Sequence, residues 1–183
     1  ENAARAHFAL KKLLAEEDAD GVAMNCLRRG MLKPCMSFAT LNGELIPAAC
    51  ENDLPAAYTQ MLGQLLTARP GFQHNASMDT ERNLFFGAHC TSPSRMHGSS
   101  GPSEPYILRS HAEAGWGCVP QVLFPAGQKV TFGKFHSGGK PPDMVIYSGT
   151  TAGCPGNPPA GGCRTNVEIK LDATVIPLAM TGA

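Results

Sequence analysis

Two residues, Glu51 and His89, stand where apolar segments end and are the first candidates for chemistry. Glu51 follows the short apolar run 46–50, and ligands of an α/β sheet bind at the carboxyl ends of its strands. His89 ends the apolar run 84–88 and precedes a polar loop, where an imidazole can ligate a metal or carry a proton. Each also has a structural interpretation: Glu51 can favour a helix dipole, and His89 can be a half-buried histidine with satisfied nitrogens.

A second set of candidates lies in the segment 106–113, which is predicted to be a strand. Strand alternation places Ile107, Arg109, His111 and Glu113 on one face. Such a face is either a binding surface or an ordinary solvated face, and the alternation does not choose between them.

Composition limits the classes of function. The 183 residues include 15 Lys+Arg and 15 Asp+Glu, so the formal net charge is zero and nucleic-acid binding by clustered cations is not expected. With 43% hydrophobic and 16% charged residues the sequence is typical of a globular protein, and its apolar runs are too short to span a bilayer. The 7 cysteines are an odd number and lie mostly in or beside apolar segments, which favours reduced, mostly buried thiols in a cytoplasmic protein.

The first 71 residues alternate between predicted helices and short strands, which is typical of an α/β layer. Helices are predicted over 3–17, from Pro34 to the Asn42-Gly43 pair, and from Leu54 to the stop at Pro70-Gly71, with strands over 21–26 and 46–50. Asp53 is a good N-cap for the third helix. The apolar residues of this helix form one stripe, as in a helix that packs one face on a core: Leu54, Tyr58, Met61, Leu62, Leu65 and Leu66.

After Gly71 the pattern changes to short strands separated by turn residues. A hairpin is predicted from 72–78 and 84–90 around the loop 79–83, followed by strands over 106–113, 118–124, 129–136, 144–151, 164–172 and 173–180. Such a series suggests an antiparallel sandwich or small barrel. The predicted fold class is therefore α+β, with an α/β part over 1–71 and a β part over 72–183.

The chain resembles the L-fucose/L-arabinose isomerase family, in its fucose isomerase-like branch. The resemblance covers most of the chain from about residue 20 onward and is carried by segments in the same order and spacing: 31–35, 46–53, 69–72, 87–91, 108–113, 130–134 and 163–165. It implies that 1–71 is the end of a Rossmann-like α/β domain and that 72–183 is a β-barrel domain, incomplete at its C-terminus. The parent protein would then carry a further N-terminal domain.

The resemblance also implies an activity and its site. Members are aldose–ketose isomerases that act through an enediol with a divalent cation, typically Mn²⁺, and they are homo-oligomers. Glu51 matches the acid that ligates the metal and moves the proton, and His89 matches a metal-ligating histidine. The second acidic position of the family falls on His74 or Asn75, neither of which is an acid. The expected metal ligands are Glu51, Asn75 and His89, and the residues expected to contact the sugar are His74, Arg109 and His111.

Alternatives to an isomerase stay open at this point. A homologue that kept the fold and lost the second acid would be an inactive carbohydrate-binding protein, and metal binding separates the two. A metal-dependent enzyme of other chemistry, such as epimerisation, is a third possibility that product analysis would separate. The expected partners are a sugar and further copies of the chain in a cytoplasmic protein, with no nucleic acid and no membrane.

Overall fold

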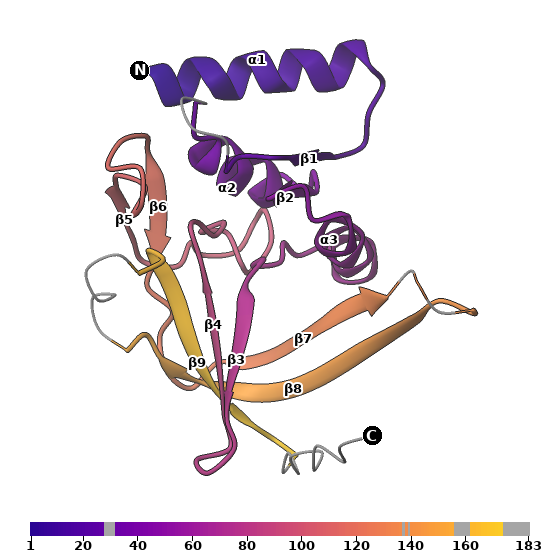
Figure 1. Cartoon of the computed structure of the whole chain (residues 1–183), viewed down its shortest axis with the longest axis vertical. Coiled ribbons are helices and arrows are strands. Elements are labelled where there is room, and N and C mark those ends of the chain that lie inside the picture. Colours follow the sequence, from indigo (N-terminus) through magenta and orange to yellow (C-terminus); the bar gives the residue numbers. More distant parts are fainter. Residues whose placement is uncertain (28–31, 137, 139, 156–161, 174–183) are drawn as a thin grey trace, which may run out of the picture.

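A computed structural model gives the fold and describes residues 1–27, 32–136, 138, 140–155 and 162–173 (Figure 1). Helices and two short strands come first along the chain, and strands make up the rest. The first part consists of α1 (Asn2–Glu16), β1 (Val22–Met24), α2 (Cys35–Gly43), β2 (Ala48–Cys50) and α3 (Leu54–Thr67). The predicted helices and strands of this part are all present, with strands shorter than predicted.

The first part is organised around one β–α–β unit. Strands β1 and β2 are parallel, with Val22 beside Ala48 and Met24 beside Cys50, and α2 connects them. The residues that pack between α1, α2 and these strands form a small core: Leu10, Cys26, Phe38, Leu41, Ala48 and Cys50. The end of β2 faces the second part of the molecule, since Glu51, the next residue, lies 3.7 Å from His89 of that part.

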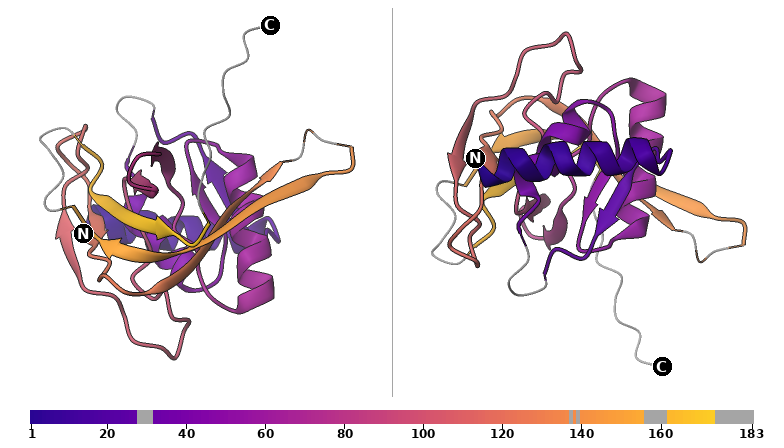
Figure 2. Two further views of the ribbon diagram at one scale, coloured as in Figure 1. Left: turned by 90° about the horizontal axis from the view of Figure 1, so that it is seen from below. Right: turned by 90° about the horizontal axis from the view of Figure 1, so that it is seen from above.

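The second part is a curved, open antiparallel sheet, seen as a half-barrel in Figures 1 and 2. Its strand order is β3-β4-β9-β8-β7. The strands are β3 (Asn75–Asp79), β4 (Leu84–His89), β7 (Lys129–His136), β8 (Asp143–Gly153) and β9 (Thr165–Leu171). A separate hairpin joins β5 (Tyr106–Arg109) to β6 (Val119–Val122). The structure confirms the predicted fold class, α+β, and the antiparallel arrangement of strands in the second part.

A second core lies on the concave side of the sheet. It consists of Phe85, Val122, Phe124, Val167, Ile169 and Leu171, with Phe72 and Phe132 packed against them. Alternate residues of β4 are buried, so Phe85, Gly87 and His89 face this core. The hairpin predicted from 72–78 and 84–90 is thus present as β3 and β4, and it sets the direction of His89.

The strand predicted over 106–113 ends early, at Arg109. His111 begins a turn instead, because its backbone N–H donates to Trp116 O at 3.0 Å and its Nδ1 accepts from Ala114 N at 3.2 Å. The alternation that placed Arg109 and His111 on one strand face was therefore wrong. The last predicted strand, 173–180, lies almost entirely outside the described residues.

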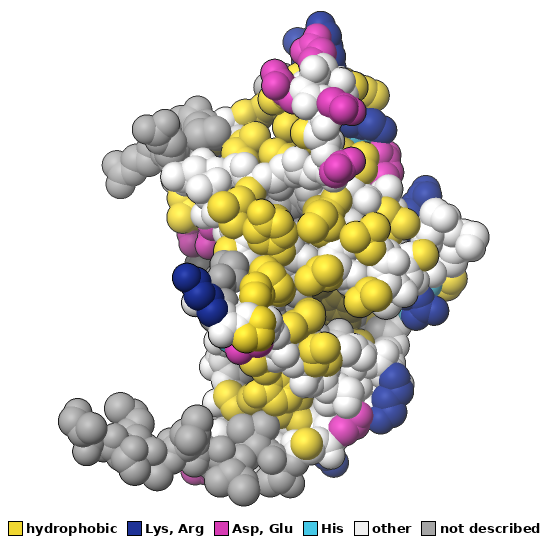
Figure 3. Space-filling view, turned by 90° about the vertical axis from the view of Figure 1, so that its right-hand side faces the viewer, with side chains coloured by type: hydrophobic (Ala, Val, Ile, Leu, Met, Phe, Trp, Pro, Cys, Tyr) yellow, Lys and Arg dark blue, Asp and Glu magenta, His cyan; other side chains and the backbone are white. Residues whose placement is uncertain are grey.

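The apolar stripe predicted along α3 is not buried. Leu65 is 76% exposed and Leu66 is 82% exposed, whereas the inward positions are Gln60 and Gln64, at 7% and 6%. Gln64 has a polar partner inside the molecule, since its Nε2 donates to Asn42 Oδ1 at 3.3 Å. Figure 3 shows hydrophobic side chains gathered on the face of the molecule that includes α3. The helix itself is as predicted, with Asp53 Oδ1 accepting from Ala56 N at 2.9 Å.

Candidate functional site

Glu51 projects from a sharp turn at the carboxyl end of β2. Its φ is 62° and that of Asn52 is 57°, so two successive side chains with a Cβ occupy the left-handed region. Such conformations cost on the order of 1–3 kcal/mol each and persist only where the surroundings hold them. Here Asn52 N donates to Met24 O at 3.1 Å and Glu51 N donates to Cys26 Sγ at 3.4 Å. The turn leaves the Glu51 side chain about a third exposed, at 32%.

His89 faces Glu51 from the end of β4. Its Nε2 lies 3.7 Å from Glu51 Oε1, and only 2% of the side chain is exposed. Neither ring nitrogen has a hydrogen-bond partner among the described residues. Because a buried polar group without a partner is costly, both nitrogens mark a place where a ligand would be stabilising.

The protonation state of His89 follows from its surroundings. Burial, with smaller contributions from the neighbouring His74 and His111, lowers its pKa to about 4, and Asp53 partly opposes this shift. The ring is therefore neutral at pH 7, and its contact with Glu51 is not an ion pair. A neutral imidazole beside a carboxylate has a lone pair that can bind a cation.

His74 approaches the same region across the face of β4. Its Nδ1 donates to Phe72 O at 2.9 Å, which leaves Nε2 as an acceptor, and burial lowers its pKa. The ring packs edge-on to Phe85 with centroids 5.2 Å apart. Gly87 makes room for it, since a Cβ at Gly87 would lie 2.9 Å from His74 Cδ2.

Asn75 is placed differently from His74. It is exposed at the start of β3, and its Cα partner in β4 is Ala88, whose side chain is on the face opposite to that of His89. Of the two residues at the second acidic position of the resemblance, the structure brings His74 toward His89.

His111 and Arg109 are both engaged within the chain. His111 is buried, with Nε2 lying 3.2 Å from Cys90 Sγ, and burial lowers its pKa. Arg109 Nη1 donates to Gln121 Oε1 at 3.3 Å. The structure places His111 within electrostatic reach of His89, while Arg109 is tied to the hairpin β5–β6.

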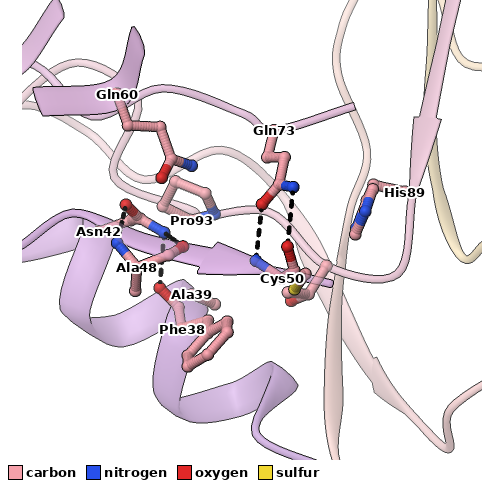
Figure 4. Close-up of a pocket in the computed structure, with 10 residues that line it drawn as sticks. Phe38, Ala39, Asn42, Ala48, Cys50, Gln60, Gln73, His89 and Pro93 are labelled. Atoms are coloured by element: carbon pink, nitrogen blue, oxygen red, sulfur yellow. Dashed lines mark hydrogen bonds between the residues drawn. The ribbon is translucent and has the colours of Figure 1, made fainter. Parts of the chain in front are cut away.

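Gln73 is a site residue that the sequence did not indicate. Its side-chain amide pairs with the end of β2: Oε1 accepts from Cys50 N at 2.8 Å and Nε2 donates to Cys50 O at 3.3 Å (Figure 4). This amide fixes the strand end from which Glu51 projects. Gln73 and His89 both line a small cavity (Figure 4). Its volume of about 10 Å³ is too small for a sugar. The Glu51 carboxylate is open to solvent on its other, partly exposed side.

All seven cysteines are free thiols, and several lie near this site. Cys26 and Cys50 are buried in the first core, and Cys26 Sγ accepts from Glu51 N at 3.4 Å. Cys90, which follows His89, has its Sγ 3.2 Å from His111 Nε2. The sequence indicated buried thiols but gave no sign of these contacts, because the residues that make them are far apart along the chain.

The donor set for a cation at this site consists of Glu51 and His89. In the described part of the chain, no group of three or more His, Cys, Asp or Glu side chains is arranged to hold a metal ion. Comparison with protein-family models and with curated proteins found no match. Among the described residues, no helix has both the length and the apolar character needed to cross a membrane.

Proposed function

We propose that this chain belongs to a divalent-metal-dependent aldose–ketose isomerase of the L-fucose/L-arabinose type. The observation that carries the proposal is the convergence of the Glu51 carboxylate on the neutral, unpartnered imidazole of His89, at 3.7 Å, where β2 ends. The resemblance described above selects these same two residues. In this proposal the first part is the end of a Rossmann-like domain, the half-barrel belongs to a β-barrel domain, and the whole protein is a cytoplasmic homo-oligomer.

Two of the residues present, Glu51 and His89, are donors of the kind that a cation such as Mn²⁺ takes. Carboxylate and imidazole groups suit Mn²⁺, and the buried nitrogens of His89 have no partner in the described structure. Glu51 and His89 would hold the ion, and His74, with Nδ1 fixed on Phe72 O, presents Nε2 nearby. When bound, the cation would polarise the sugar carbonyl and stabilise the negative charge that develops on its oxygen.

The protein's own contribution is to move the proton and hold the sugar. In an aldose–ketose isomerisation a base removes a proton from one carbon of the C1–C2 pair and returns it to the other. Glu51 is the group proposed for this step, because it is partly exposed and its backbone is held by Met24 and Cys26. Because His89 is neutral, no positive charge on its ring competes with a cation for the Glu51 carboxylate.

A carbohydrate-binding protein without isomerase activity is the second candidate function. One observation favours it. At the position where the isomerase family has its second acid, the residue near His89 is His74, which has no carboxylate. Asp53, another carboxylate near His89, already accepts a hydrogen bond from Ala56 N at the start of α3. Among the described residues around His89, a second carboxylate free to move a proton is therefore missing.

The test of the proposal is a calorimetric Mn²⁺ titration of the full chain and of Glu51→Gln. We expect saturable binding that is lost in Glu51→Gln and weakened at least about tenfold in His89→Ala, because each lost ligand costs on the order of 1.4 kcal/mol or more. The matched control is Glu44→Gln, which alters an exposed glutamate paired with Lys11 at 2.8 Å and should leave binding unchanged. Equal affinity in all four proteins would refute the site.

Activity separates the two candidate functions. An isomerase incubated with Mn²⁺, an aldose and D₂O exchanges the C2 hydrogen of the sugar with solvent, which proton NMR detects as loss of that signal. Sugar binding without exchange in the oligomeric parent protein would favour the carbohydrate-binding alternative. Inversion at a carbon without formation of a ketose would indicate an epimerase.

A further inference from the structure

Strand β5 is the free edge of the β5–β6 hairpin. Among the described residues it pairs with β6 alone, and Figure 1 shows β5 at the outer edge of the molecule, with β6 on its inner side. Three of its residues, Tyr106, Ile107 and Leu108, are 50%, 44% and 58% exposed. Proteins usually protect an apolar edge strand, because its unpaired backbone groups can bond to another chain. The exposure of β5 therefore needs an explanation.

The register of the hairpin shows which backbone groups of β5 point outward. Leu123 N donates to Pro105 O at 2.8 Å, so these two residues form a hydrogen-bonded pair directly beside the strands. Hydrogen-bonded and non-hydrogen-bonded pairs alternate along antiparallel strands, which puts Tyr106 and Leu108 at non-hydrogen-bonded positions. The N–H and C=O groups of these two residues consequently point away from β6.

The far side of β6 supports this assignment. Val122 lies opposite Tyr106, and its N–H donates to Thr165 Oγ1 at 3.4 Å, so it points away from β5 as the alternation requires. The outward backbone groups of Tyr106 and Leu108, by contrast, have no hydrogen-bond partner in the described part of the chain. They are spaced as a further strand would need them.

A groove lies along one face of β5, between this strand and α2. Its volume is about 250 Å³, and apolar side chains of both elements line it: Met36 and Ala39 of α2, and Tyr106 and Leu108 of β5. The two β5 residues are two positions apart, so they share the face of the strand that borders the groove. A strand added along β5 would direct alternate side chains toward the same groove.

The charges at the groove favour an acidic occupant. Arg95 lines the groove, is exposed, and forms no ion pair or side-chain hydrogen bond with any described residue. Every Asp and Glu of the chain is among the described residues, so none of them is paired with Arg95. Glu44, which also lines the groove, is already paired with Lys11 at 2.8 Å. The groove thus carries one uncompensated positive charge beside its apolar walls.

We propose that the edge of β5 binds an extended segment of a partner protein, which adds to the hairpin as a further strand. The outward groups of Tyr106 and Leu108 bond to the main chain of this segment, one of its apolar side chains fills the groove, and a neighbouring carboxylate pairs with Arg95. In this mode of recognition main-chain hydrogen bonds give affinity, and pockets for alternate side chains give specificity. Neither Glu51 nor His89 lines the groove, so the proposal does not rest on the isomerase activity.

The test is a selection of binders from a displayed library of random octapeptides on the immobilised full chain. The enriched sequences should alternate apolar with other residues and contain Asp or Glu. One enriched peptide is then synthesised, and its Kd is measured by fluorescence polarisation. N-methylation of the alternate amides that face β5 should weaken binding roughly two- to tenfold for each hydrogen bond lost, whereas N-methylation of the amides between them should not. This comparison needs no protein variant, so it remains decisive if a variant does not fold.

Protein variants locate the binding site. Leu108→Pro removes an outward N–H without removing a hydrogen bond of the hairpin, and it should weaken binding more than Leu108→Ala, which keeps that N–H. Arg95→Gln should weaken binding roughly two- to fivefold at low salt and less at high salt. The matched control is Arg69→Gln, which changes another exposed arginine and should leave the Kd unchanged.

Three results would overturn the proposal. The first is a selection that enriches no peptide. The second is binding that is equally strong in Leu108→Pro and Arg95→Gln as in the wild type, or equally sensitive to both sets of N-methyl groups. The third is a wild-type chain that sediments as a dimer and becomes a monomer in Leu108→Pro, because a second copy would then occupy the edge of β5.

Discussion

Gly87 offers a direct test of how His74 is positioned beside His89. A Cβ at Gly87 would lie 2.9 Å from His74 Cδ2 and 3.3 Å from Phe85 Cε1, whereas non-bonded carbons prefer about 3.5 Å or more. The histidine ring has little freedom to move, because Nδ1 donates to Phe72 O and the ring packs against Phe85. In Gly87→Ala the ring or the strand must therefore shift.

The expected magnitude combines two opposing effects. Overpacking a well-packed core costs about 1–3 kcal/mol, and replacing a strand glycine by alanine returns about 0.5–1 kcal/mol of backbone entropy. We expect Gly87→Ala to lower the free energy of unfolding by about 1–2 kcal/mol. For a chain of this size that corresponds to a Tm lower by roughly 2–8 °C.

Chemical and thermal unfolding followed by circular dichroism measure this difference. The control is Gly63→Ala in α3, where an added Cβ meets nothing within 4 Å. It should raise the stability by about 0.5–1 kcal/mol, because alanine is the better helix former. If Gly87→Ala is as stable as the wild type, or is stabilised like Gly63→Ala, the close packing of His74 over Gly87 is refuted.

Three further predictions concern buried polar groups. The pKa of His89 is lowered from 6.5 to about 4 in the folded, metal-free chain. Between these two pH values the unfolded chain therefore binds a proton at His89 that the folded chain does not. The free energy of unfolding should accordingly fall by about 3 kcal/mol from pH 6.5 to pH 4. Denaturant titrations at several pH values should show this loss, and its persistence in His89→Gln would assign it to another group. Asn42→Ala should cost about 2–4 kcal/mol in a urea titration, since the buried amide donates to Ala48 O at 2.8 Å and accepts from Ala48 N at 3.1 Å, and an unchanged midpoint would contradict this. Asp53→Ala should lower the Tm through a loss of about 1 kcal/mol, because Asp53 caps α3 by accepting from Ala56 N, whereas Asp53→Asn should retain most of the stability.

Local sequence determined the elements that hold the site. The Asp53 cap, the helix that follows Pro34 and the hairpin around 79–83 all form where turn and capping residues predict them, because their hydrogen bonds join residues only a few positions apart. The position of Glu51 after β2 and of His89 at the end of β4 follows from the same local boundaries.

Only the tertiary structure decided which side chains meet. Three contacts join segments that the sequence keeps apart: the 3.7 Å approach of Glu51 to His89, the placement of His74 rather than Asn75 near His89, and the 3.2 Å contact of Cys90 with His111. The exposure of the apolar stripe of α3 was also decided by the tertiary structure. The sequence specifies an apolar face of the helix, but whether that face is buried depends on what packs against it. Here the face that carries Gln64 is buried instead, and Gln64 Nε2 donates to Asn42 Oδ1. The periodicity of apolar residues predicts whether a segment is a helix or a strand. Which of its side chains are buried, and what they hydrogen-bond to, depends on residues far along the chain.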